Sequence, residues 1–365
     1  MNNELFYLIS LTQAAGIGPT KARLLLRHFG SAEEVFKAKN KSLLQIQDIG
    51  PATIRALTQV DFKKTERELN FIDTKGVRTC SLLDDRYPQR LLHCDDAPIL
   101  LYGMGNYDWN PTRSISVVGT RKATSYGKSF CTALMQAILP FQPTVVSGLA
   151  YGIDYCAHTT ALEYGLPTVA CVAHGLEKIY PDAHRALANR MIHHGGVITE
   201  FASHTPMAPE MFPMRNRLIA GLGDCTIVVE TDIKGGSMIT AHIASSYGRD
   251  VFALPGRYTD KLNRGCHALI KRNIAAILTA PEDIIEYMGW NEPTVKPQQQ
   301  LRLFNELENT QRIIASYIQQ QGKPTFDAIL EDSGMSWGQL NSALMGLEFD
   351  GLIRSLPGKR YEIIG

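Results

Sequence analysis

A series of short apolar segments, rich in β-branched residues, alternates with amphipathic segments of helical period between about residues 115 and 289. Short continuous apolar runs are typical of strands that are buried on both faces, and such strands occur in parallel sheets covered by helices. The alternation therefore predicts an α/β domain with a doubly wound, mostly parallel sheet of the Rossmann-like kind. The predicted strands are 114–118, 144–147, 168–173, 197–199, 225–230, 251–254 and 275–278.

The first 75 residues have a different pattern, in which glycine turns separate short helical segments. A Gly-x-Gly-Pro turn occurs at 16–19, and a related turn that lacks the first glycine occurs at 48–51; basic residues, among them Arg23 and Arg55, follow them. A glycine turn between two helices resembles the SAM-like helix-hairpin-helix module, whose turn offers N–H groups to a DNA phosphate. Tight interhelical turns need glycine for the same geometry. The sequence therefore leaves open whether this domain binds DNA or braces its neighbour.

A polar segment with two prolines follows Trp290 and reads as a linker. After it come three predicted helices and a turn at Pro357 and Gly358 that suggests a hairpin, a combination that resembles a winged helix. The third helix, 336–350, contains no Lys or Arg, so we expect it to contact protein or to regulate rather than to anchor duplex phosphates. The predicted domains are helical 1–75, Rossmann-like 76–289, linker 290–309 and winged-helix 310–365.

Composition limits the kind of partner and the compartment. The 37 Lys and Arg against 36 Asp and Glu give a formal charge of +1, so affinity for nucleic acid must come from locally placed cations rather than from a global field. The seven cysteines include no Cys-x-x-Cys pair, which argues against a disulfide framework and a zinc site. No targeting segment and no long apolar stretch is apparent, so we expect a cytoplasmic protein without a membrane partner.

Glycine and charged residues follow several predicted strands, at the sheet edge where ligands bind in folds of this kind. Glycine lets the backbone approach an anion closely, and the N-terminus of a following helix directs N–H groups at it. Arg121 adds a guanidinium that can hold a phosphate by two bonds, and Ser237 is placed to cap a helix. A single loop of this kind is better explained as a strand-to-helix turn. Several such loops at one edge of the sheet favour a phosphate-binding site. The candidates are Gly119, Thr120, Arg121, Gly148, Gly235, Gly236 and Ser237.

The segment 212–221 is the most distinctive in the chain, because two arginines flank an asparagine directly before a small apolar helix. Arg215, Asn216 and Arg217 are therefore further candidates for phosphate contact. Alternatively, one of the two arginines pairs with Glu200 or Glu230 and holds the crevice together. The sequence leaves both roles open.

The sequence offers little for catalysis. It has no P-loop, no Gly-x-Ser-x-Gly nucleophile turn and no His-Glu-x-x-His zinc motif. Asp154 and His158 are four residues apart, on one face of a predicted helix, and in principle form an acid–base pair. Such a pair more often holds a loop by hydrogen bonds. We therefore predict no catalytic residue, no metal and no cofactor.

Six sequence blocks resemble, in order and spacing, the DNA processing protein A (DprA/Smf) family, and together they cover the whole central domain. The helical N-terminal region and the winged-helix region also look like that family's accessory domains. The blocks are Gly119-Thr120-Arg121, Ser147 to Asp154 with His158, Gly175 to Pro181, Phe212 to Gly221, Gly236 to Ala241 and Gly248 to Gly256.

The resemblance implies a non-enzymatic mediator of natural transformation that binds incoming single-stranded DNA, protects it, dimerises through its Rossmann-like domain and loads the RecA recombinase. By position, Arg121 matches the family's leading phosphate contact. Lys178 matches a basic position that the family uses on the strand, and Arg215, Asn216 and Arg217 match its Arg-Asn-Arg block. Tyr180, close to Lys178 in the sequence, is a further candidate. The family's dimer surface falls near 266–272 and the following strand. Binding by charge and N–H groups, without base reading, would be largely independent of sequence.

Two blocks depart from the family pattern. The first is more often Gly-Ser-Arg, and Thr120 keeps the hydroxyl while adding a methyl group. The fifth is often Ser-Gly-Ser, so Gly235 removes one side-chain hydroxyl, which puts a side-chain contact of that loop in doubt.

Two other functions remain as alternatives. The first is a nucleotide-binding enzyme similar to the lysine-decarboxylase-like phosphoribohydrolases, using Asp154 or Glu230; the stretch nearest to their motif, 234–241, lacks its glutamate. The second is a transcription regulator that binds duplex DNA through the winged helix, for which Arg354, Lys359 and Arg360 supply charge in the predicted wing.

Overall fold

The computed structural model describes residues 3–290, 309–349, 352–356 and 359–363. These residues fall into two compact units, Met1–Met288 and Gly289–Gly365, which we describe separately. Residues 1–75 belong to the same unit as the sheet, and the domain boundary at residue 75 stays a prediction.

A nine-stranded sheet forms the centre of the first unit in the described part of the chain, in the order β1-β2-β6-β5-β4-β3-β7-β8-β9. Neighbouring strands from β6 to β9 in this order are parallel, and each of the seven predicted strand segments forms one of them. The strands are β1 (Arg78–Ser81), β2 (Leu100–Gly105), β3 (Ser114–Val118), β4 (Thr144–Ser147), β5 (Thr168–Cys171), β6 (Gly195–Thr199), β7 (Cys225–Val228), β8 (Asp250–Ala253) and β9 (Ala276–Ile277).

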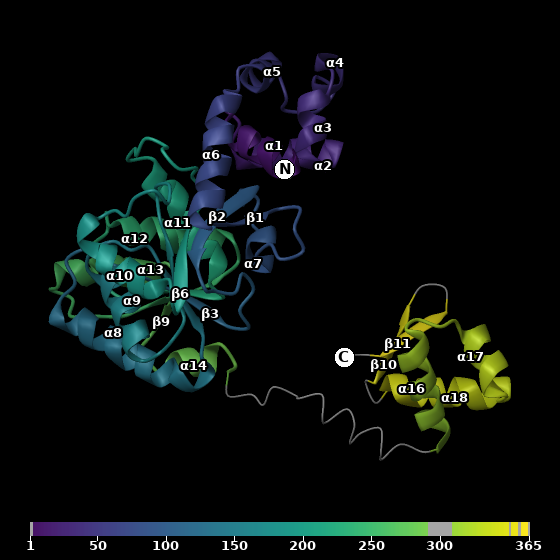
Figure 1. The fold of residues 1–365 in the computed structure, drawn as a ribbon. Helices are drawn as coiled ribbons and strands as arrows, with labels where there is room; N and C mark the ends of the chain where they lie inside the picture. The colour runs from purple at the N-terminus through teal and green to yellow at the C-terminus, as the bar shows by residue number, and fades with distance from the viewer. Residues whose placement is uncertain (1–2, 291–308, 350–351, 357–358, 364–365) are drawn as a thin grey trace. The chain divides into compact units, whose positions relative to one another are not determined.

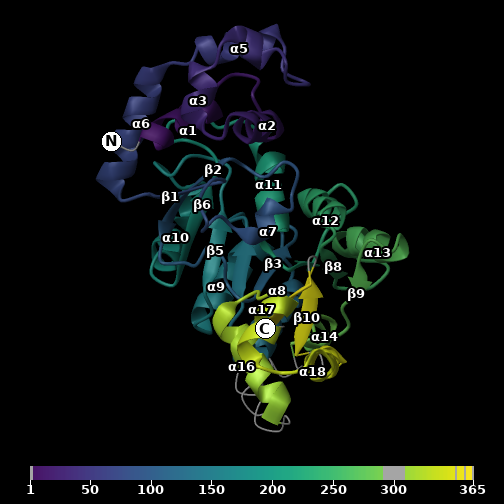
Figure 2. The same cartoon turned by 90° about the vertical axis from the view of Figure 1, so that its right-hand side faces the viewer.

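The sequence prediction missed β1 and β2, which pair antiparallel with each other and join the sheet through β6. β1 is composed of Arg-Thr-Cys-Ser and β2 ends in glycine, so neither has the apolar pattern of the inner strands. In Figure 2 the sheet runs from β1 on one side to β9 on the other.

Helices cover both faces of the sheet. Strands β3, β4, β5 and β6 follow one another toward one edge of the sheet, and α8, α9 and α10 connect them. Strands β7, β8 and β9 follow one another toward the opposite edge, and α12 and α13 connect them. Because such crossovers are right-handed, α8, α9 and α10 lie on one face and α11, α12 and α13 on the other. The strand order therefore reverses between β3 and β7. These helices are α7 (Gln89–Leu92), α8 (Ser125–Ile138), α9 (Ile153–Glu163), α10 (Arg185–Met191), α11 (Met211–Leu222), α12 (Gly236–Ser246), α13 (Arg264–Lys271) and α14 (Asp283–Tyr287).

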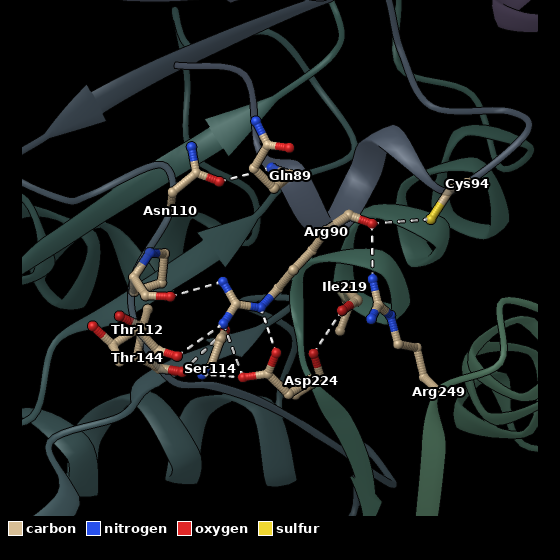
Figure 3. Close-up of polar contacts among 12 residues, drawn as sticks. Gln89, Arg90, Cys94, Asn110, Thr112, Ser114, Thr144, Ile219, Asp224 and Arg249 are labelled. Atoms are coloured by element: carbon tan, nitrogen blue, oxygen red, sulfur yellow. Dashed lines mark hydrogen bonds and ion pairs between the residues drawn. The ribbon is translucent and has the colours of Figure 1, made fainter. Parts of the chain in front are cut away.

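A hydrogen-bonded cluster closes the amino ends of β3 and β7 (Figure 3). The Arg90 guanidinium of α7 bonds both carboxylate oxygens of Asp224, at 2.6 and 2.9 Å, and the carbonyl oxygens of Pro111 and Thr112. Asp224 also accepts from the backbone N–H of Ser114, where β3 begins, at 2.8 Å. The charge of Arg90 is thus neutralised at this end of the sheet, and α7 is fixed to both strands.

Six helices precede β1, and α6 leads from this group to the edge of the sheet (Figure 1). The predicted glycine turns lie where expected: Gly18 precedes α2 and Gly50 precedes α5, each followed by proline at the first helical position. Arg23 of α2 is buried and donates to the carbonyl oxygens of Cys94 and Leu92, so this helix braces the α/β domain. The helices are α1 (Asn3–Gln13), α2 (Pro19–Phe29), α3 (Ala32–Lys37), α4 (Asn40–Leu43), α5 (Pro51–Thr58) and α6 (Phe62–Lys75).

The second unit contains three helices and a hairpin, as predicted for a winged helix. They are α16 (Asn309–Gln321), α17 (Phe326–Ser333), α18 (Trp337–Phe349), β10 (Ile353–Leu356) and β11 (Arg360–Ile363). Ile314, Ile318, Leu340 and Leu347 form its core. The predicted turn at 357–358 and most of the predicted linker lie outside the described residues. Within the described ranges, no helix has the length and apolar character needed to cross a membrane.

Candidate phosphate-binding crevice

A cavity of about 270 Å³ lies at the carboxyl ends of β3 and β7, where the strand order reverses. Ligands bind at this point in doubly wound folds. A smaller cavity of about 50 Å³ adjoins it, because Arg121, Ala150, Phe212 and Arg215 line both. Ten of the twelve predicted site residues line one or both: Gly119, Thr120, Arg121, Gly148, Tyr180, Arg215, Asn216, Gly235, Gly236 and Ser237. Lys178 and Arg217 line neither.

Arg121 is the exposed cation of the crevice. It follows β3, and its guanidinium carbon lies 5.9 Å from the centre of the Phe212 ring. No carboxylate of a described residue is within ion-pair distance of it. The loop is held by Ile153, whose N–H donates to the Thr120 carbonyl oxygen at 3.1 Å, and by Gly152, whose φ of 80° and close approach to Thr120 require glycine. A rigid loop therefore presents an uncompensated guanidinium.

Arg215 lies beneath the crevice and is buried. It donates to the carbonyl oxygens of Gly148 and Cys171, after β4 and at the end of β5. A β-carbon at position 148 would come within 2.6 Å of both Arg215 Nη1 and Asp154 Oδ2, so any other residue there would displace these two side chains. Arg215 thus ties together the loops that form the floor.

The buried Arg215 interacts with the buried carboxyl group of Asp154, and Arg121 acts on Arg215 in turn. Burial lowers the pKa of Arg215, nearby Asp154 opposes that shift, and Arg121 adds to it. Burial raises the pKa of Asp154, and Arg215 acts in the opposite direction. Since Asp154 faces the buried Arg215, Arg121 is left as the cation that an anionic ligand can neutralise.

Arg217 points away from both cavities. It is buried, pairs with Glu200 and donates to the carbonyl oxygen of Asp96. The alternative in which one arginine of the 215–217 block forms a structural ion pair with Glu200 is therefore confirmed for Arg217.

Glu230, the other acid considered as a partner or a catalyst, is buried at the start of α8. Its carboxylate accepts from the backbone N–H of Thr124 at 3.0 Å and from the Thr124 hydroxyl, and Thr124 caps α8 through the N–H of Gly127. Glu230 therefore occupies the N-terminus of this helix as an anion of the protein itself.

The N-terminus of α12 lines the larger cavity. The prediction that Ser237 caps this helix is wrong, because Gly235 is the N-cap residue and makes no side-chain cap. Ser237 lies two positions later, and its Oγ is buried without a hydrogen-bond partner among the described residues. The backbone N–H groups of this first turn, rather than a hydroxyl cap, are what the loop offers to an anion.

Asp154 and His158 both lie on α9, as expected from their spacing, but each has a different partner. Asp154 accepts from the Ala150 N–H at 3.3 Å, and His158 Nδ1 lies 2.7 Å from the Thr168 hydroxyl. Burial lowers the pKa of His158 to about 3, so the ring is neutral. Asp154 lines the larger cavity, whereas the buried His158 lines neither, so the two side chains do not face a ligand together as an acid–base pair.

Lys178 lies in the segment that leads to Tyr180, beside the smaller cavity. Its side chain is 44% exposed, and its Nζ lies 3.7 Å from Glu177 Oε1. Tyr180 is half exposed; its N–H donates to His174 Nε2 at 3.1 Å, and its ring lies 6.0 Å from Phe212.

Sequence reasoning missed the aromatic rim. Tyr151 is half exposed, and both Tyr151 and Phe212 line the smaller cavity together with Tyr180. Both belong to the sequence blocks that carried the prediction, so aromatic residues next to glycine and arginine were the available signal.

Three regions of this chain match known protein families. Residues 78–289 match the family described as DNA recombination-mediator protein A, residues 8–60 a SAM-like helix-hairpin-helix tandem, and residues 306–359 the DprA winged helix domain. A putative DNA processing protein DprA of Mycobacterium tuberculosis is 33% identical over 311 residues, which cover 80% of this chain and 78% of that protein. The DNA processing protein DprA of Streptococcus pneumoniae is 39% identical over 205 residues, or 56% of this chain and 72% of that protein.

Two solved structures share the fold. The X-ray structure of DNA processing protein A from Streptococcus pneumoniae matches with a TM-score of 0.65 at 32% identity, covering 77% of this chain and 97% of that one. DNA processing protein A from Helicobacter pylori, whose single-stranded DNA binding mode is described with its structure, matches with a TM-score of 0.52 at 25% identity, covering 59% and 96%.

Proposed function

Since this chain belongs to the DNA recombination-mediator protein A family, the DprA/Smf proteins, we propose that it binds single-stranded DNA in the crevice at the ends of β3 and β7 and loads a RecA recombinase onto it during natural transformation. The observation that carries this proposal is Arg121. It is exposed at the crevice and has no carboxylate partner among the described residues, whereas Arg215 and Arg217 are buried and bonded to protein groups.

The crevice suits a phosphate better than a base. Arg121 supplies two parallel donors, and the first turn of α12 supplies backbone N–H groups beside it. Asn216 also lines the cavity, and Lys178 is an additional cation near its entrance. Contacts of this kind hold the backbone of a nucleic acid without selecting a sequence.

Selection of single strands follows from shape and from the aromatic rim. A flexible strand bends its phosphates into a narrow crevice at little cost. Bending a stiff duplex strongly costs about 1–6 kcal/mol. The exposed rings of Tyr151 and Tyr180 offer faces on which unpaired bases stack. Bases held in a duplex are not available for such stacking.

We also propose a homodimer through α13 and the neighbouring edge of the sheet. β9 is the last strand in the order, and both of its residues are exposed, Ile277 to 42%. An open strand edge is a ready surface for pairing with a second copy. A dimer places two crevices on one DNA strand and raises the apparent affinity through effective concentration. The proposed function includes no catalytic step and is placed in the cytoplasm.

The test is equilibrium binding of oligothymidine and of duplex by the wild type, Arg121→Ala and Lys178→Ala. We expect a marked preference for the single strand and a loss of about 10- to 100-fold for Arg121→Ala, because a hydrogen bond to a charged group contributes about 1.5–3 kcal/mol. Lys178→Ala should lose less, since its side chain lies outside the cavity. Arg27→Ala, an exposed arginine of α2, is the matched control. Equal affinity for duplex, or unchanged binding by both crevice variants, would overturn the proposal.

The recombinase step has its own readout. With the same oligonucleotides, wild-type protein should accelerate nucleation of a RecA filament, and Arg121→Ala should not do so at concentrations that saturate the wild type. Acceleration by a variant that no longer binds DNA would contradict loading through this crevice.

A further inference from the structure

Helix α6 lies between the other N-terminal helices and the sheet (Figure 1). A second hollow region lies along this helix. It consists of two cavities, of about 750 and 490 Å³, which adjoin because Arg67 and His204 line both. The first is bounded by the outer face of α6 and the second by α1, α6 and the loop 200–206. We call the two together the α6 groove.

The α6 groove carries an excess of exposed positive charge. Its exposed cations are Lys63, Lys64, Arg67 and Lys75. None of them has a carboxylate of a described residue within ion-pair distance. A concave surface with several unpaired cations attracts a polyanion.

The acidic residues that line the α6 groove do not cancel its excess of positive charge. Asp61 caps α6 by accepting from the Lys63 N–H at 3.1 Å, and Glu66 is the other exposed acid of the lining. Glu68 is buried and accepts from the Ser203 hydroxyl, and burial raises its pKa. Glu200 is buried against Arg217. Asp73 is exposed on α6 but does not line either cavity.

The groove also contains ring faces. The ring centres of Phe71 of α6 and His204 lie 6.3 Å apart with an interplanar angle of 67°, and His204 is exposed. Cations that track a backbone together with rings that accept bases are the two components of a surface for single-stranded nucleic acid.

The groove adjoins the crevice through the segment 175–181. Gly175 lies against the loop 200–206, because a β-carbon there would be 2.5 Å from the Ala202 carbonyl oxygen and 2.7 Å from Ser203 Cα. At the other end of the segment, Tyr180 lines the smaller cavity of the crevice. Lys178, which is 44% exposed, lies between the two ends. The segment 175–181, which contains Lys178, therefore connects the crevice to the loop that lines the α6 groove.

We propose that the α6 groove binds the part of a DNA strand that leaves the crevice, so that α6 and the loop 200–206 extend the single-strand site beyond the sheet. The inference rests on the proposed function, because the crevice supplies the strand. It gives the N-terminal helices a direct part in DNA binding through α6, while the buried Arg23 of α2 acts as a brace.

The experiment compares oligothymidines from about 4 to about 30 nucleotides, a range that brackets known site sizes on single-strand binding domains. The variant is Lys64→Gln with Arg67→Gln in the full chain, and the matched control is Lys39→Gln with Lys41→Gln, two exposed lysines at α4 outside the groove. We expect the groove variant to bind the shortest oligonucleotide like the wild type and the longest about 10-fold more weakly. For the long oligonucleotide the salt slope should fall by about 1.4, since each phosphate contact contributes about 0.7. The control should match the wild type at every length.

Three results would overturn the inference: equal loss at all lengths, no loss at any length, or an equal loss by the control pair. The conservative exchange Lys64→Arg with Arg67→Lys should retain wild-type affinity, which separates charge from misfolding. If the wild type binds the short oligonucleotide through Arg121 but gains nothing from α6, the inference fails and the proposed function stands. If the wild type binds no single strand, both fail.

Discussion

Strands β3 and β7 lie side by side with an arginine near each end of the pair, and the two ends differ in how that arginine is used. At the amino end, Arg90 bonds both oxygens of Asp224 and two backbone carbonyls (Figure 3). At the carboxyl end, Arg121 is exposed over Phe212 and no carboxylate of a described residue pairs with it.

The difference separates stability from binding. A guanidinium whose donors are all directed at protein oxygens fixes neighbouring segments but has nothing left for a ligand. A guanidinium on a rigid loop without a counter-ion contributes little to folding and leaves its charge for an anion. The amino end should therefore respond to substitution in stability, and the carboxyl end in DNA affinity.

The largest loss of stability is expected for Arg215→Ala. Arg215 lies beneath the crevice, at the carboxyl end of β3 and β7, which we call the open end because Arg121 is exposed there. This change leaves Asp154 buried without its cation and the carbonyl oxygens of Gly148 and Cys171 without their donor. Removing a charged donor from a buried carbonyl oxygen costs about 1–3 kcal/mol, and Arg215 serves two of them, so the free energy of unfolding should fall by about 3 kcal/mol and the denaturant midpoint should fall with it. Arg121→Ala, its exposed neighbour, should stay within about 0.5 kcal/mol of the wild type. A loss below about 1 kcal/mol for Arg215→Ala would mean that Arg215 is not a structural floor.

A smaller loss of stability is expected for Arg90→Ala at the amino end of β3 and β7, which we call the closed end because the donors of Arg90 are bonded to protein oxygens. Removing the guanidinium leaves Asp224 with only the Ser114 N–H and releases α7 from both strands. We expect about 2 kcal/mol lower free energy of unfolding, the value of a charged hydrogen bond, with oligothymidine affinity unchanged. If folded Arg90→Ala bound oligothymidine more weakly than the wild type, the closed end would take part in DNA binding, and the contrast between the two ends would be wrong.

The pH dependence of stability tests the neutral histidine behind the crevice. His158 has its pKa lowered to about 3 by burial, whereas an unfolded histidine titrates near 6.5. The unfolded chain therefore binds one more proton between these values, and stability falls as pH drops below about 6.5. Between pH 7.5 and 5.5 this one group removes about 1.4 kcal/mol, and His158→Gln should lose that part of the pH dependence in denaturant titrations. A variant with the wild-type pH slope would show that His158 is charged or hydrated in the folded state.

The smallest effect is expected from removing the second unit. A chain that ends at residue 290 keeps the crevice and the α6 groove, and α18 contains no Lys or Arg to anchor a phosphate. Its affinity for oligothymidine should change by less than about 3-fold, or about 0.6 kcal/mol, when measured beside the full chain. A loss of 10-fold or more would place part of the DNA site in the winged helix.

Much of the fold was predictable because its inner strands are continuous apolar runs, which only a sheet covered on both faces accommodates. The antiparallel strands β1 and β2 were not predictable in this way, since Arg78 and Thr79 begin one and Gly103 interrupts the other. Their place is set by the pairing of β2 with β6, which is far away in the sequence, and by the pairing of β1 with β2.

The crevice was predictable from glycine and charge after consecutive strands, because parallel strands place their carboxyl ends at one edge. Roles within it were not. Arg215 and Arg217 are two residues apart in the sequence, yet each meets different oxygens in the fold. Ser237 looked like a cap because of its residue type, but Gly235 already begins the helix. The α6 groove escaped prediction because it joins helix 62–75 to a loop more than 100 residues later.

The salt dependence of oligothymidine binding tests the difference between the two ends most directly. The slope of log affinity against log salt counts phosphate contacts, at about 0.7 for each contact with a single strand. We predict that Arg121→Ala lowers the slope by about 0.7 while Arg90→Ala keeps the wild-type slope. An unchanged slope for Arg121→Ala, or an equal change for Arg90→Ala, would contradict the assignment of phosphate binding to the open end of β3 and β7.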